Sequence, residues 1–95
     1  MGSEVTPLCW LYVIRSLKDG RLYTGIAASR DNRLREHNTG RVRSTRNRRP
    51  FVLVYSEPFE TRAQAMARER YFKTPEGGAL KQRLVGTAES EDNRI

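Results

Sequence analysis

The feature that most constrains the fold is a pair of apolar segments around an Asp19-Gly20 dipeptide, in the stretch "LYVIRSLKDGRLYTG" (residues 11–25). An Asp-Gly pair between two apolar runs is typical of a β-hairpin, so we expect strands at residues 10–16 and 22–27. The first strand has apolar side chains on both faces: Trp10, Tyr12 and Ile14 on one, Leu11 and Val13 on the other. A sheet with two apolar faces must be covered on both, so we expect helices to flank it.

The rest of the chain supplies such helices. In "SRDNRLREHNTG" (residues 29–40), Ser29 suits a helix N-cap and Gly40 suits a helix stop. The run "PFVLVYS" (residues 50–56) is β-branched and aromatic after an opening proline, which indicates a third strand.

A second helix is expected in "TRAQAMARERYFK" (residues 61–73), because Thr61 and Gln64 have the spacing of a capping box. We expect it to end near Pro75 and the following glycines, and "ALKQRLV" (residues 79–85) to form a last short helix. The pattern predicts an α+β fold, with a small three-stranded antiparallel sheet flanked by helices in the order β-β-α-β-α-α.

The length of 95 residues allows one compact domain, which we place at residues 9–85. We expect residues 1–8 to be a flexible N-terminus and residues 86–95 a flexible polar tail. No run approaches the roughly 20 apolar residues of a membrane span, and no secretory signal is visible. Cys9 is the only cysteine, which excludes an internal disulfide and a cysteine-rich zinc site. The expected location is the cytoplasm.

The charge points to a polyanionic partner. The chain has 18 basic and 11 acidic residues, and 15 of the basic ones are arginine, which binds phosphate through a planar fork. The segment "RVRSTRNRR" holds five arginines and no acid: Arg41, Arg43, Arg46, Arg48 and Arg49. If all five contact phosphates, log affinity should fall against log salt with a slope of about −4.5. The alternative is a basic surface that only keeps the protein in solution.

The hairpin also carries two tyrosines on one face, Tyr12 and Tyr23. A two-residue loop would pair Ile14 with Gly25 and leave the tyrosines about 13 Å apart along the strands. Gly25 would leave a gap in that face, where a backbone or a ligand can approach closely. Taken alone, the two tyrosines are as expected for core aromatics.

Two further positions suggest chemistry. Arg33 and His37 share a helix face and would form an exposed pair able to hold a phosphate, unless that face is simply solvated. Glu69 lies on the apolar side of its helix, where a carboxylate needs a partner: a metal ion, or a cation such as Arg33 in a structural ion pair. Whether Lys73, one turn later, enters this site or covers the surface is open.

Together these residues resemble the GIY-YIG nuclease superfamily, in particular its small stand-alone bacterial-type proteins. The motifs are "LYV" and "YTG" for the two tyrosine triplets, then "RLREHN", "RRPFVLVYSEPF" and "AMARERYFK", in the family's order. The resemblance covers residues 10–85, nearly the whole predicted domain.

The resemblance implies an endonuclease that hydrolyses DNA phosphodiester bonds with a single Mg²⁺ or Mn²⁺ ion. It assigns catalytic roles to Tyr12, Tyr23, Arg33, His37 and Glu69, with Glu69 as the metal ligand. Either tyrosine can be the general base, and His37 can assist proton transfer. The alternative functions are a non-catalytic nucleic-acid-binding module and, less favoured by the charge, a protein-interaction module.

Overall fold

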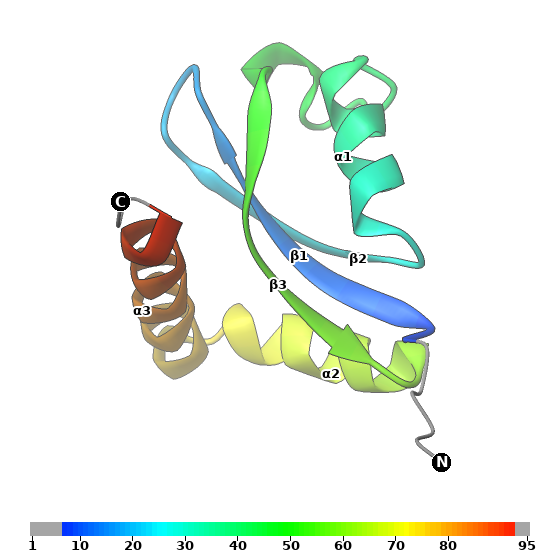
Figure 1. Ribbon diagram of the computed structural model, residues 1–95, viewed down its shortest axis with the longest axis vertical. Helices are drawn as coiled ribbons and strands as arrows, with labels where there is room; N and C mark the ends of the chain where they lie inside the picture. The colour runs from blue at the N-terminus through cyan, green and yellow to red at the C-terminus, as the bar shows by residue number, and fades with distance from the viewer. Residues whose placement is uncertain (1–6, 93–95) are drawn as a thin grey trace.

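The computed structural model describes residues 7–92 and has three strands and three α-helices (Figure 1). Strands β1 (Cys9–Ser16), β2 (Leu22–Ala27) and β3 (Phe51–Phe59) form one antiparallel sheet in the order β2-β1-β3. Helix α1 (Arg30–Asn38) follows the hairpin, and α2 (Arg62–Phe72) and α3 (Pro75–Asp92) end the chain. The predicted α+β fold with a three-stranded antiparallel sheet is confirmed. Within the described range, no helix is both long and apolar enough to cross a membrane.

The two faces of the sheet have separate cores, as the two-sided pattern of β1 predicts. On one face Tyr12, Ile14 and Phe51 form a buried cluster, against which Leu34 of α1 packs. On the other face Leu11 and Val13 pack with residues of the last two helices, Phe72 and Val85. Figure 1 shows α1 on one side of the sheet and the α2–α3 pair on the other. Residues that alternate along one strand are therefore divided between two different environments.

Helix α1 begins and ends where the sequence predicts. The Ser29 side chain accepts a hydrogen bond from the Asn32 backbone, and Gly40, just past the C-cap, has the positive φ of 83° that favours glycine. The Asn38 side chain then bonds both the N–H and the C=O of Phe51, at 2.7 and 3.0 Å. This pair of bonds ties the end of α1 to the start of β3.

The predicted hairpin register is wrong by two residues. Ile14 lies opposite Tyr23 and Tyr12 lies opposite Gly25, because five residues and not two connect the strands. The Ser16 side chain explains the longer turn, since it accepts hydrogen bonds from the backbone N–H groups of Lys18 and Asp19. A side chain that bonds its own turn thus overrides the simple Asp-Gly signal.

The prediction for the last helix is also wrong in its limits. Helix α3 starts at Pro75, ahead of the glycines, and continues to Asp92. The Thr74 side chain caps it by accepting from Gly77 N at 3.0 Å, and proline suits the first helical position. Gly77 is needed for packing, since a Cβ there would lie 1.8 Å from the Tyr71 carbonyl oxygen at the end of α2.

The expected flexible tail is therefore helical over residues 86–92, and an ion pair of 3.0 Å joins Glu89 to Arg15 of β1. Residues 93–95, like residues 1–6 of the expected flexible N-terminus, lie outside the described residues. At the other end, Leu8 donates a backbone hydrogen bond to Phe59 O at 3.1 Å. The folded unit thus includes more of both ends than residues 9–85.

Candidate active site

The Tyr12 hydroxyl begins a chain of hydrogen bonds that runs from β1 into α1 and the basic loop. It lies 2.9 Å from Nε2 of His37, whose Nδ1 lies 2.7 Å from Oγ1 of Thr45. Thr45 donates its own hydroxyl hydrogen to the Val42 carbonyl, at 3.4 Å, so it accepts from His37. This arrangement places the imidazole hydrogen on Nδ1 and leaves Nε2 as the acceptor of the Tyr12 hydrogen.

His37 is not the exposed partner of Arg33 that the helix spacing suggested, because its side chain is fully buried. Burial, and then the positive charge of Arg33, lowers the pKa of His37 to about 4, against a smaller opposing effect of Glu36. The imidazole is therefore neutral near pH 7. The two residues share a helix, but only Arg33 reaches the surface.

Gly25 explains how the Tyr12 hydroxyl fits between the strand and the helix. A Cβ on Gly25 would lie 2.5 Å from the Tyr12 oxygen, which is much closer than atoms can approach. The gap expected at this glycine exists, and the end of the Tyr12 ring fills it. Burial raises the pKa of Tyr12 to about 12; a hydrogen bond from Arg33 opposes this rise.

Tyr23 lies close to the same group. Its ring centroid is 6.4 Å from that of Tyr12 and 5.0 Å from that of His37. The two tyrosines are therefore neighbours, and the expected separation of 13 Å is wrong because it came from the wrong register. Tyr23 is also the more exposed of the two, whereas Tyr12 has only 1% of its surface accessible.

Arg33 and Glu69 bring opposite charges toward the Tyr12 hydroxyl from two different helices. Arg33 forms an ion pair of 2.6 Å with Glu36 and also lowers the pKa of Tyr12, while the charge of Glu69 raises that pKa. Glu69 is half-buried, and its ion-pair partner is Lys73, at 3.7 Å, rather than Arg33. Tyr23, His37 and Arg33 thus lie around the Tyr12 hydroxyl, whereas Glu69 acts on it through charge alone, as the weakest of the effects on its pKa.

Glu69 is the only one of these five residues whose side chain suits Mg²⁺. Over residues 7–92 no group of three or more His, Cys, Asp or Glu residues is placed to hold a metal ion. A single carboxylate fits an ion that keeps several waters and also binds substrate phosphate, as Mg²⁺ commonly does. The ion pair with Lys73 is long, and 65% of the lysine side chain is exposed, so the carboxylate can exchange this partner.

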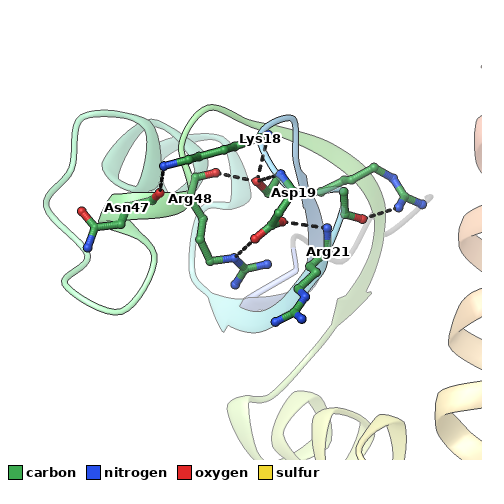
Figure 2. Close-up of polar contacts among 8 residues, drawn as sticks. Lys18, Asp19, Arg21, Asn47 and Arg48 are labelled. Atoms are coloured by element: carbon green, nitrogen blue, oxygen red, sulfur yellow. Dashed lines mark hydrogen bonds and ion pairs between the residues drawn. The ribbon is translucent and has the colours of Figure 1, made fainter.

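The five arginines of the basic loop do not behave alike. Arg48 forms an ion pair with Asp19 of the hairpin turn, at 3.0 Å (Figure 2). Its guanidinium also lies over the Phe51 ring. Arg46 and Arg49 are exposed, and each is held through Nε by a backbone carbonyl. Arg41 and Arg43 are exposed as well. Arg48 thus anchors the loop, and the other four arginines line its surface.

Thr45 is the member of the site that the sequence does not reveal. It is fully buried in a loop of charged residues and fixes the orientation of the His37 ring. No local signal distinguishes it, because Val42, Ser44 and Asn47 are also uncharged residues among the arginines of this loop.

Comparisons with known proteins show the family of this chain. A family model described as the GIY-YIG catalytic domain matches residues 8–81. A UPF0213 protein of Staphylococcus saprophyticus is 42% identical over 66 residues, and UPF0213 proteins of Staphylococcus haemolyticus and Staphylococcus aureus are 41% identical. These matches cover 68% of this chain and 79% of each relative. The solution NMR structure of a UPF0213 protein from Bacillus halodurans is 32% identical, with a TM-score of 0.48 and coverage of 83% of both chains.

Proposed function

This chain belongs to the GIY-YIG nuclease family, and from that premise we propose that it is a metal-dependent endonuclease that hydrolyses phosphodiester bonds of DNA. The observation that carries the proposal is the Tyr12 hydroxyl. It contacts a neutral imidazole, and the charges of Arg33 and Glu69 both act on it. A purely structural tyrosine would not need an arginine hydrogen-bonded to its hydroxyl beside a buried neutral imidazole.

Glu69 would hold the metal ion, Mg²⁺ or Mn²⁺. When bound, such an ion neutralises charge on the scissile phosphate and on the leaving oxygen. Arg33 would contact the phosphate and stabilise the negative charge that develops in the transition state. Arg33 can release Glu36 and bind a phosphate instead, because both side chains of that ion pair are more than a third exposed.

The proton path follows the hydrogen bonds. A water molecule attacks phosphorus, its oxygen forms the new P–O bond, and the bond to the leaving oxygen breaks. The water proton would pass to the Tyr12 oxygen as the Tyr12 proton moves to His37 Nε2, so no free phenolate with a pKa of about 12 is needed. Because the pKa of His37 is about 4, the imidazole would hold this proton only briefly and return it through Tyr12 to the leaving oxygen. Tyr23, the more exposed tyrosine, would orient the water or the phosphate.

The decisive test is cleavage of labelled duplex, flap and branched DNAs with Mg²⁺ or with EDTA. Glu69→Ala should lower the metal-dependent rate by about 10³-fold, because several kcal/mol of charge stabilisation are lost. Glu60→Ala removes an exposed carboxylate that lies just before the N-cap of α2 and is the matched control; it should cut like the wild type. Equal cutting by Glu69→Ala and the wild type would contradict the proposed metal site.

The second candidate is a nucleic-acid-binding module without catalysis. It is favoured by the long ion pair between Glu69 and Lys73, which satisfies the carboxylate without a metal. In that case DNA binding would survive Glu69→Ala, need no divalent ion and lead to no cutting with any metal. The cleavage panel, run with a binding assay on the same DNAs, separates the two functions.

A further inference from the structure

Hydrogen bonds and an ion pair join the hairpin turn to the basic loop, although about 30 residues separate them along the chain. The Ser16 side chain is fully buried and donates to Arg48 O at 2.6 Å, and Leu17 N donates to Pro50 O at 2.8 Å. The Arg48–Asp19 ion pair, and a bond of 3.0 Å from Lys18 Nζ to Asn47 O, complete the contact (Figure 2). We call this set of bonds the turn–loop clasp.

A polar hollow of about 370 Å³ lies beside the clasp. Its lining is Lys18, Asn38, Arg46, Asn47, Arg49 and Pro50. Three of these residues are cations, none is an acid and none is aromatic. The nearest carboxylate in the clasp, Asp19, is occupied by Arg48 and by the backbone N–H of Arg21.

The cations of the hollow are held in place before any ligand arrives. Arg46 and Arg49 are fixed through Nε, by Gly40 O at 3.1 Å and by Arg46 O at 2.7 Å, which leaves the outer guanidinium nitrogens as donors. Lys18 uses one of its three donors on Asn47. Donors that are already positioned lose less conformational freedom when an anion binds.

We propose that this hollow is a second phosphate-binding site, which holds the backbone of a nucleic acid at a distance from the scissile phosphate. The three cations without an acid fit a phosphate group, and the lack of an aromatic lining leaves no surface for base stacking. Binding there is therefore independent of sequence. The inference rests on the proposed function for the identity of the polyanion as nucleic acid and for the position of the scissile phosphate.

The hollow borders the candidate active site. Asn38, in its lining, follows His37 along α1, and Arg46 follows Thr45. A nucleic-acid backbone held in the hollow would thus fix the direction in which the substrate crosses the site.

The test measures DNA binding in EDTA in a Glu69→Ala background, so that cleavage plays no part. The triple variant Lys18→Ala, Arg46→Ala and Arg49→Ala should bind a labelled 20-base-pair duplex at least about tenfold more weakly at 100 mM salt. The slope of log affinity against log salt should become shallower by about 2.7, for every sequence tried. The matched control replaces Arg62, Arg70 and Arg83, three exposed arginines of α2 and α3, and should keep the wild-type slope.

Equal losses in the two triple variants would show that only total charge matters, and would overturn the proposal. Failure of the unmutated background to bind DNA at all would overturn it too. Salt-dependent binding through the hollow with no cutting by the wild type would keep this inference and contradict the endonuclease. Normal cutting by the wild type, together with an unchanged salt slope in the first triple variant, would contradict this inference and keep the endonuclease.

Asp19→Asn provides a second test, because attraction by total charge and binding in a preformed hollow predict opposite changes in DNA affinity. The change raises the net charge from +7 to +8, so attraction by total charge predicts tighter binding. Loss of the ion pair with Arg48 loosens the clasp, so a preformed hollow predicts binding that is weaker or no better. Tighter binding with a steeper salt slope would overturn the proposal.

Discussion

At the scale of single residues, the site depends on a tyrosine that lies opposite a glycine. Tyr12 and Gly25 lie opposite each other, and the tyrosine hydroxyl takes the space where any other residue would place a Cβ. His37 then receives the hydroxyl hydrogen because Thr45 and Val42 fix its tautomer. The hydrogen bonds among Tyr12, His37 and Thr45 therefore leave Nε2 of His37 as the atom that can accept the Tyr12 proton.

Removing either tyrosine hydroxyl tests the proposed roles. Tyr12→Phe should lower the cleavage rate by about 10²-fold or more, since the proton acceptor is lost, and Tyr23→Phe should have a smaller effect. Single-turnover rates on a saturating duplex measure this. A larger loss in Tyr23→Phe would make Tyr23 the base and Tyr12 a positioning residue, and wild-type rates in both would leave the tyrosines as packing residues.

The buried neutral His37 predicts a pH-dependent stability. Its pKa is about 4 when folded and near 6.5 when unfolded, so protons bind the unfolded chain more strongly between these values. Stability is complete above about pH 7 and falls as the pH drops through 6.5. The wild type should lose about 2 kcal/mol more than His37→Gln between pH 7 and pH 5 in urea unfolding. Parallel pH profiles for the two proteins would contradict the lowered pKa.

At the scale of elements, the connections between elements depart from the sequence-based expectations more than the elements themselves. The hairpin turn is longer than the Asp-Gly pair suggests because Ser16 bonds the turn backbone. Helix α3 starts before its glycines because Thr74 caps it and Gly77 lets its first turn touch the end of α2. In both places a contact between segments decides where an element begins.

The glycines of α3 allow a comparison of the same substitution at two positions. Gly77→Ala should destabilise the fold by about 3 kcal/mol, because the new methyl group overlaps the Tyr71 carbonyl and the helices must move apart. Gly86→Ala should stabilise it by about 0.5–1 kcal/mol, since open space surrounds that position. Urea unfolding monitored by circular dichroism measures both; similar effects at the two sites would contradict the packing role of Gly77.

At the scale of the whole molecule, β1 is shared by both cores. Leu11 and Val13 belong to the cluster under α2 and α3, whereas Tyr12 and Ile14 belong to the cluster under α1. Because alternate residues of one strand support the two sides, neither side can be lost alone. We therefore expect the domain to unfold in one cooperative step.

This expectation can be tested with Trp10, the single tryptophan, which lies under the Arg30 guanidinium of α1, 4.0 Å from ring centroid to cation. Val85→Ala, on the opposite side of the sheet, should cost about 2 kcal/mol and shift the Trp10 fluorescence and helix transitions equally. Val52→Ala, at a partly exposed position, is the control and should change little. If Val85→Ala shifted the unfolding transition of the helices but not that of Trp10 fluorescence, unfolding in one cooperative step would be contradicted.

The sequence by itself determined the α+β class, the strands of the hairpin, the limits of α1 and the capping box of α2, because alternation, helix caps and turn residues act over a few neighbouring residues. It also singled out the five residues that are proposed for the active site. The tertiary structure alone decided how they meet: the register that makes Tyr12 and Tyr23 neighbours, the burial that keeps His37 neutral, and the ion pair that removes Arg48 from the basic surface. These properties depend on contacts between residues far apart in the chain, with free energies that no local pattern records.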